Sequence, residues 1–256
     1  MTHTLHGLVI RETAVKEQDK FLTVLTAELG KISVYCHGAR SVKSRHIAAA
    51  QLFCYNEFVI TSRGDTYTLK EAVLQDNFYA LRNSFERLAL AQYVVEVLGE
   101  MTSECEDCGA LLRLALNTLY ALSYTDKPEA IIKAAFELRA ISEEGFMPDL
   151  GVCAGCGEMA EVMYLDVMNG HLICGGCAEE VDPVAMAARG TNFILLNVGP
   201  DVLEAMRYVL RAPLGRLFSF SMNEHDLADF TVVCERYFVN HMERSFKTLE
   251  FYNSLR

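Results

Sequence analysis

Residues 7–40 read GLVIRETAVKEQDKFLTVLTAELGKISVYCHGAR, in which three apolar runs alternate with short polar or glycine-containing breaks. The runs are rich in Val, Ile, Leu, Thr and Phe. Short β-branched and aromatic runs bounded by such breaks are typical of β-strands. We therefore expect three strands, over residues 5–15, 20–28 and 31–36.

Two further runs of the same kind follow, at residues 52–61 and 66–73. Arg63-Gly64-Asp65, between them, is a tight-turn signal. A longer link, residues 37–51, separates the third run from the fourth. Five strands with an extra element after the third suit a small closed barrel of the OB-fold type, so the sequence predicts an OB-fold at the N-terminus.

Beyond residue 77 the apolar side chains recur every three or four positions, which is the period of an amphipathic helix. Four helices are expected at residues 78–98, 110–123, 128–145 and 200–210. A last helix is expected to begin at the capping box Ser221 to Glu224 and to continue to Tyr252. Its buried side would be formed by Leu227, Phe230, Cys234, Phe238, Met242, Phe246, Leu249 and Tyr252.

The expected fold class is therefore α+β. It combines an N-terminal OB-fold β-barrel with an α-helical domain that carries a four-cysteine zinc-binding insert. We divide the chain into an OB-fold nucleic-acid-binding domain (1–76), the first part of the helical domain (77–150), the insert (151–182) and the second part of the helical domain (183–256).

The insert is defined by the pattern Cys153-x2-Cys156-x17-Cys174-x2-Cys177. Two CxxC pairs at this separation can place four thiolates at the corners of a tetrahedron, the geometry that zinc prefers. Glycines inside the pairs allow tight turns, and Asn169-Gly170 predicts a two-residue hairpin turn between them. Four cysteine ligands leave no open position for a water molecule, so we expect one structural Zn²⁺ ion. Incidental cysteines or a redox pair are the alternatives.

A third pair, Cys105-x2-Cys108, lies in an acidic segment without a partner pair at a usable distance. It is either an exposed dithiol or an incidental spacing. The chain has nine cysteines in all. In a reducing compartment, paired cysteines mark metal or redox chemistry more often than disulfides.

Charge is distributed unevenly along the chain. The formal net charge is −11, but residues 1–80 carry nine basic and eight acidic side chains. Residues 31–46 contain no acidic side chain at all. The candidate DNA-binding residues are Lys31, Arg40, Lys43 and Arg45. Arg11, Lys16, Lys20 and Arg63 extend this set, and Tyr35, Phe53 and Tyr55 offer stacking faces. The alternative is an ordinary solvated loop.

No catalytic motif emerges from the sequence: GxSxG, HExxH, GxGxxG and the kinase signatures are all missing. The first seven residues lack the basic start and long apolar run of a signal peptide. The longest apolar stretch, residues 89–98, is interrupted by Gln92 and Glu96. We therefore expect a cytoplasmic protein that is not an enzyme and does not bind a membrane.

Several short segments, in this order and at this spacing, resemble the RecO family of bacterial recombination mediators. They span nearly the whole chain: Gly7-Leu8-Val9-Ile10-Arg11, Glu17-Gln18-Asp19-Lys20, Leu29-Gly30-Lys31, His37-Gly38-Ala39-Arg40, Lys43-Ser44, Phe136-Glu137-Leu138-Arg139, Gly145-Phe146-Met147-Pro148 leading into Cys153, and Arg244 through Phe251.

This resemblance implies functions that residue spacing does not reveal. Proteins of this family bind single- and double-stranded DNA and anneal complementary strands. They work with RecR, and with RecF in some settings, to load RecA onto DNA coated by single-strand-binding protein. The resemblance further implies that Lys31, Arg40, Lys43 and Arg45 contact phosphates, with Arg11 and Lys20 as weaker contacts, and that the protein is associated with the nucleoid.

Two other classes of function are weighed against this one. A zinc enzyme would need an open metal position and an acid/base cluster, and the sequence indicates neither. A zinc-stapled interaction module, whose barrel binds protein partners instead of DNA, is compatible with the negative net charge.

Overall fold

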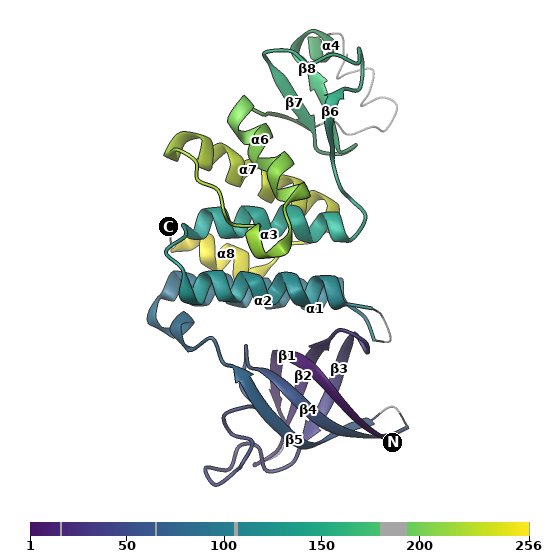
Figure 1. The fold of residues 1–256 in the computed structure, drawn as a ribbon, viewed down its shortest axis with the longest axis vertical. Helices are drawn as coiled ribbons and strands as arrows, with labels where there is room; N and C mark the ends of the chain where they lie inside the picture. The colour runs from purple at the N-terminus through teal and green to yellow at the C-terminus, as the bar shows by residue number, and fades with distance from the viewer. Residues whose placement is uncertain (16, 65, 105–106, 180–193, 256) are drawn as a thin grey trace. The chain divides into compact units, whose positions relative to one another are not determined.

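The computed structural model describes residues 1–15, 17–64, 66–104, 107–179 and 194–255 (Figure 1). Two compact units can be distinguished. One comprises Met1–Asp126 together with Phe246–Arg256, and the other comprises Lys127–Ser245. Within the described ranges, no helix has both the length and the apolar character that a membrane crossing requires.

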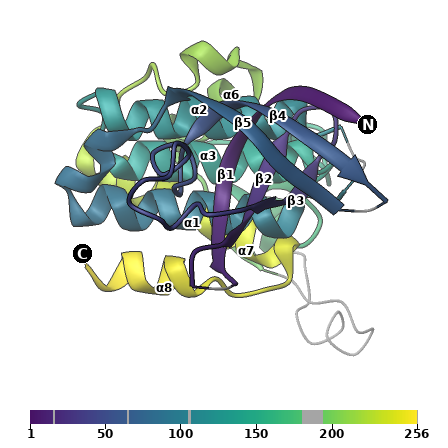
Figure 2. The same cartoon turned by 90° about the horizontal axis from the view of Figure 1, so that it is seen from below.

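Five strands form the barrel of the first unit: β1 (Thr2–Ala14), β2 (Lys20–Thr26), β3 (Lys31–Cys36), β4 (Tyr55–Arg63) and β5 (Thr66–Asp76). They close in the order β1-β2-β3-β5-β4, which confirms the predicted OB-fold barrel. The β3–β5 pairing is parallel, and all other pairings are antiparallel. Figure 2 shows β4 and β5 running side by side as a long hairpin.

Buried and exposed side chains alternate along the strands, and the buried ones form the barrel core. In β3, Ile32, Val34 and Cys36 are buried while Ser33 between them is exposed. Every second side chain of a strand points to the same face, so one face of each strand fills the barrel. The core consists of Leu5, Val9, Leu22, Val24, Ile32, Val34, Cys36, Ala39, Ala50, Cys54, Phe58, Ile60 and Leu69.

The helices of the first unit are η1 (Tyr79–Asn83), α1 (Phe85–Met101), α2 (Gly109–Tyr124) and α8 (Lys247–Ser254). The expected helix at residues 78–98 is therefore interrupted near its start. Ser84 has an extended backbone and its side chain accepts a hydrogen bond from the backbone N–H of Arg87, so α1 begins there with its own cap.

The second unit contains the helices α3 (Glu129–Glu143), α4 (Gly175–Glu179), η2 (Leu214–Arg216), α6 (Pro200–Arg211) and α7 (Glu224–Met242). A small sheet has the strand order β6-β8-β7-β9, formed by Asp149–Cys153, His171–Cys174, Met163–Asp166 and Leu195–Asn197. The strand Leu195–Asn197 lies beyond residue 182, so the sheet reaches past the expected end of the insert. The four-part domain division itself stays a prediction.

The predicted last helix is wrong as one continuous element. Helix α7 is capped by Asn223 and ends at Met242, and Glu243 has a left-handed backbone with φ 51°. The chain resumes as α8 after Phe246. Apart from Leu227 and Met242, which are half-buried, the apolar stripe is buried on both sides of the break, but α7 packs on α3 and α8 packs on α1. A regular apolar period therefore does not reveal that its two halves belong to different units.

Candidate metal centre and candidate nucleic-acid interface

The four predicted zinc ligands come together at one end of the small sheet. One ligand atom from each of Cys153, Cys156, Cys174 and Cys177 lies within 4.8 Å of all the others. The sulfurs of Cys156 and Cys174 are 3.8 Å apart. Four sulfurs at about 2.3 Å from a tetrahedral zinc ion would be separated by about 3.8 Å. The cluster therefore fits a four-coordinate metal ion.

Local backbone geometry places the sulfurs. Strands β7 and β8 form the predicted antiparallel hairpin, but Asp166 pairs with His171, so the turn holds four residues and not two. The Asp166 carboxylate accepts hydrogen bonds from the backbone N–H groups of Met168 and Asn169 and holds this turn. In the first pair, a Cβ atom at Gly155 would lie 2.9 Å from the Cys177 sulfur, so glycine permits the close approach.

Hydrogen bonds favour one thiolate in this cluster. Burial by itself would raise the pKa of Cys153. However, backbone N–H groups, above all that of Cys174, donate hydrogen bonds to its sulfur and lower this pKa to about 6. Hydrogen bonding to Cys174 and the other sulfurs raises the pKa of Cys177 to about 12. Once one sulfur is charged, a second negative sulfur beside it is disfavoured. A divalent cation removes this repulsion, because it binds all four sulfurs as thiolates and releases their protons.

The predicted DNA-binding residues do not form a single patch. Arg40, Lys43 and Arg45 are exposed and lie in residues 37–54, between β3 and β4, which we call the basic loop. Lys43 has no ion pair or hydrogen bond with the described part of the chain. The Arg45 guanidinium donates to the backbone carbonyl of Lys70 on β5 at 2.7 Å, which holds this side chain against the barrel.

Lys31 and Arg11 lie elsewhere, beside α1. Both line a pocket of about 550 Å³, which is also lined by the acidic residues Glu12, Glu96 and Glu100. The Lys31 ammonium donates to the carbonyl of Gly99, in the last turn of α1. A cation is stabilised at that helix end, where the carbonyl groups carry partial negative charge. Lys31 is therefore engaged by the protein itself.

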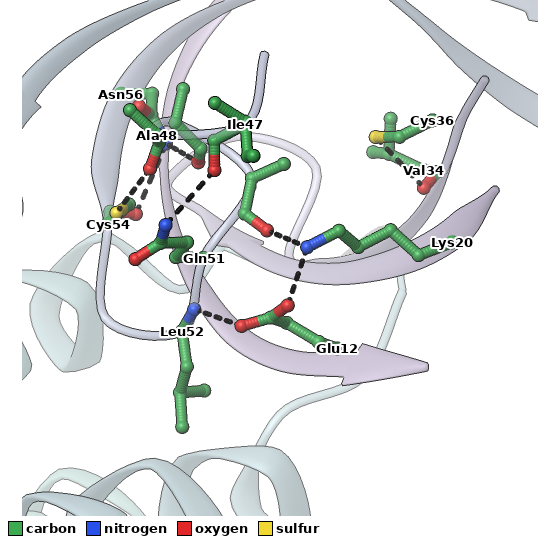
Figure 3. A network of polar contacts seen from close by, with 12 residues as sticks. Glu12, Lys20, Val34, Cys36, Ile47, Ala48, Gln51, Leu52, Cys54 and Asn56 are labelled. Carbon is green, nitrogen blue, oxygen red and sulfur yellow. Dashed lines mark hydrogen bonds and ion pairs between the residues drawn. The ribbon is translucent and has the colours of Figure 1, made fainter. Parts of the chain in front are cut away.

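Lys20 is buried, with 8% of its surface exposed. Its ammonium lies 2.7 Å from a carboxylate oxygen of Glu12 and also donates to the carbonyl of Ala50 (Figure 3). Both contacts stay within the barrel and the basic loop. A phosphate would have to displace them, so we leave Lys20 out of the proposed DNA surface.

The three aromatic candidates also differ in how far they are exposed. Phe53 is buried, with 2% of its surface exposed, so it offers no stacking face. Tyr35 is half-buried and packs on Phe21 across β2 and β3, with ring centroids 5.3 Å apart. Tyr55 is also half-buried and lies 6.0 Å from the His6 ring. Tyr35 and Phe21 are the aromatic pair on the outer face of β2 and β3.

Sequence reasoning missed Asp19. Its side chain is almost fully buried and accepts hydrogen bonds from the hydroxyl of Tyr35 and the backbone N–H of Gly38. The Nδ1 atom of His37 lies 2.9 Å from the same carboxylate. The hydrogen bond to Asp19 raises the pKa of Tyr35. Asp19 stands in a short polar connection of mixed charge, and no local signal marked it, because its partners lie 16 to 19 positions away in the sequence.

The third cysteine pair cannot be placed as a site. Cys105 lies outside the described residues, and Cys108 is buried, with 3% of its surface exposed, at the start of α2. The prediction that Cys36, Cys54 and Cys234 are buried apolar residues is confirmed, because each is at most 1% exposed.

Comparison with known proteins identifies one family over most of the chain. Residues 1–78 match the family model "Recombination protein O N terminal", and residues 82–193 match "Recombination protein O C terminal". A DNA repair protein RecO from Acetivibrio thermocellus is 32% identical over 250 residues, which cover 97% of this chain and 95% of the relative.

Two further relatives carry the same name. The protein from Symbiobacterium thermophilum is 29% identical over 99% of this chain and 98% of its own length. The protein from Desulforudis audaxviator is 31% identical over 96% of this chain and 94% of its own length. The similarity therefore extends across both compact units.

Proposed function

The chain belongs to the RecO family of DNA repair proteins, and on that premise we propose that it binds single- and double-stranded DNA and anneals complementary strands. We further propose that it helps RecR, with RecF in some settings, to load RecA onto DNA coated by single-strand-binding protein. This work would be done in the cytoplasm, at the nucleoid, and without a covalent reaction step.

The basic loop is the observation that carries the DNA-binding proposal. It presents Arg40, Lys43 and Arg45 on the surface of an OB-fold barrel, within a protein whose net charge is −11. OB-fold barrels bind single strands through a positive groove and aromatic faces. The half-buried pair Phe21 and Tyr35 on the neighbouring strands supplies such faces.

Annealing follows from this arrangement by electrostatics. Two DNA strands repel each other through their phosphates, and bound cations reduce that repulsion. Base pairing then supplies the driving force, so the protein needs only to hold strands close together. Lys31 and Arg11 would add contacts if DNA reached the pocket beside α1. Three acidic residues, Glu12, Glu96 and Glu100, also line that pocket and argue for a smaller contribution.

The cysteine cluster supports a structural Zn²⁺ ion bound by Cys153, Cys156, Cys174 and Cys177. The donor set is four thiols, the sulfur spacing fits a tetrahedron, and four protein ligands complete the coordination of the metal. Such a site stabilises the fold around it and does not activate a water molecule. The zinc would therefore hold the strands β6, β7 and β8 together.

The proposed DNA binding is tested by fluorescence anisotropy of a labelled single-stranded oligonucleotide at several salt concentrations. Four neutralised phosphates would give a slope of log K against log salt of about −3. The triple variant Arg40→Ala/Lys43→Ala/Arg45→Ala should lose most of this binding and keep its zinc content. No binding by the wild type at low salt would favour the alternative, a zinc-stapled module that binds protein partners.

A further inference from the structure

The basic loop is fastened to the barrel at both ends by neighbouring residues at the start of β2. Asp19 contacts the residues where the loop begins, and Lys20 contacts the residues where it ends. The cationic segment between the two attachments carries Arg40, Lys43 and Arg45.

At the entry, the buried Asp19 carboxylate accepts the Gly38 backbone N–H at 2.8 Å and the Tyr35 hydroxyl. Gly38 has φ +64°, so the chain turns sharply where Asp19 holds it. The backbone N–H of Arg40 also donates to the carbonyl of Gln18, beside Asp19. The first residues of the loop are thus bonded to the β1–β2 connection.

At the exit, Glu12 and Lys20 form the second attachment (Figure 3). One Glu12 carboxylate oxygen accepts the backbone N–H of Leu52, and the other pairs with the Lys20 ammonium. Lys20 also donates to the carbonyl of Ala50. Nearby, the Asn56 side chain donates to the carbonyl of Ala49 at 3.0 Å. The last residues of the loop are therefore bonded to β1, β2 and β4.

We infer that Asp19 and the Glu12–Lys20 pair are positioning residues, which hold the basic loop in the shape that presents its cations to a polyanion. This inference rests on the proposed DNA binding. A loop fixed before binding loses less conformational freedom when the ligand arrives, so its contacts contribute more to affinity. Lys20 accordingly acts through the loop and does not touch a phosphate.

Charge and positioning predict opposite changes in DNA affinity when an acidic side chain is neutralised. A simple charge argument predicts that removing an acidic group beside a DNA-binding surface strengthens binding. Positioning predicts the opposite for Asp19→Asn and Glu12→Gln. Glu17→Gln is the matched control, because Glu17 is exposed and makes no hydrogen bond or ion pair with the described residues. It removes one negative charge, as the other two variants do, and lies in the same β1–β2 connection as Asp19.

The test is anisotropy with the labelled single strand, using all three variants across salt concentrations. We expect Asp19→Asn and Glu12→Gln to weaken binding by about tenfold, and Glu17→Gln to leave it equal or slightly tighter. For Asp19→Asn and Glu12→Gln, the slope of log K against log salt should become shallower and approach that of the Arg40→Ala/Lys43→Ala/Arg45→Ala variant. In that triple background Asp19→Asn should have no further effect. Equal or tighter binding by both Asp19→Asn and Glu12→Gln would overturn the inference.

Hydrogen exchange without DNA separates this inference from the proposed function. Asp19→Asn should speed exchange at the Gly38 and Arg40 amides, and Glu12→Gln should speed it at Leu52. Tyr35→Phe, which keeps the Asp19 charge, should also speed exchange at the Gly38 and Arg40 amides, but by less. If the wild type binds no DNA but these amides respond, the DNA proposal fails and the loop attachment stands. Unchanged exchange in folded variants would refute the attachment.

Discussion

The hydroxyl group of Tyr237 on α7 occupies the space that a side chain at Gly170 would need, since a Cβ atom there would lie 2.6 Å from that oxygen. The hydroxyl donates to the carbonyl of Phe146 at 3.0 Å, and burial raises the pKa of Tyr237 to about 12. Gly170 has φ +67° and closes the turn between β7 and β8. The turn that follows the first cysteine pair is thus packed directly on α7.

Gly170→Ala should lower the free energy of unfolding by about 2–3 kcal/mol, because it combines a left-handed backbone with a contact on Tyr237. Urea unfolding followed by circular dichroism measures this. Gly145→Ala is the control: Gly145 also has a positive φ, but no described atom outside its neighbours lies within 4 Å of its Cβ position. Equal losses in the two variants would show that the contact with Tyr237 contributes nothing.

Cys174→Ser should abolish the binding of one zinc ion per chain and unfold the small sheet, because structural zinc sites contribute on the order of 10 kcal/mol to folding. Metal analysis of the purified protein gives the stoichiometry, and a chelator should reproduce the effect on the wild type. Cys36→Ala, in the barrel core, serves as the control and should retain its zinc. An unchanged zinc stoichiometry in Cys174→Ser would exclude this site.

Lys133→Met should destabilise the protein by about 3–5 kcal/mol, because it leaves a buried carboxylate without its cation. Lys133 and Glu137 form a 2.8 Å ion pair, and both side chains are 0% exposed. Burial alone would lower the pKa of Lys133, but Glu137 and Glu235 together raise it. Chemical unfolding measures the loss.

The double variant Lys133→Met/Glu137→Gln is the matched control for this ion pair. It removes both charges and should regain much of the lost stability. A single Lys133→Met variant as stable as the wild type would mean that the pair makes no net contribution.

Stability should decrease as the pH falls from about 7 to about 5, in part through His241. Its Nε2 atom is buried without a hydrogen-bond partner among the described residues, and its ring lies 4.3 Å from that of Tyr237. Burial lowers the pKa of His241, against the effect of a hydrogen bond with the Val167 backbone. The unfolded chain therefore takes up a proton at a higher pH than the folded protein, so acid favours unfolding.

His241→Asn retains an amide near the position of Nδ1 but cannot titrate, so it should flatten the pH dependence of the unfolding free energy. His225→Asn is the control on the same helix, because His225 is 87% exposed. Parallel stability curves for wild type and His241→Asn between these pH values would contradict the assignment.

Local sequence patterns were sufficient to predict the bounds of several elements. Strand β3 covers the predicted residues 31–36, and α2 and α6 lie within one residue of the expected ends. The four cysteines were identifiable because two CxxC pairs are a common way to supply four thiol ligands, and this spacing is visible along the sequence. The family was likewise recognisable from the order of short segments along the chain.

Other features depended on partners distant in sequence. Lys20 looked like a surface cation, yet its ammonium is held by Ala50, 30 residues away. Asp19 looked like an ordinary acidic residue of a polar connection, but its partners belong to β3 and the basic loop. The break at Glu243 was hidden because the apolar period continues through it, while the two helices pack on different neighbours.

By itself, the sequence determined the barrel strands, most of the helices, the four-cysteine pattern and the family, because each depends on side chains close together along the chain. Tertiary structure alone decided which cations face solvent and which hold the protein together. Burial and ion pairing are settled by where the chain folds back, as at Lys20 and Glu12. The cations of the basic loop were therefore predictable from the sequence, whereas its attachments to the barrel are visible only in the folded structure.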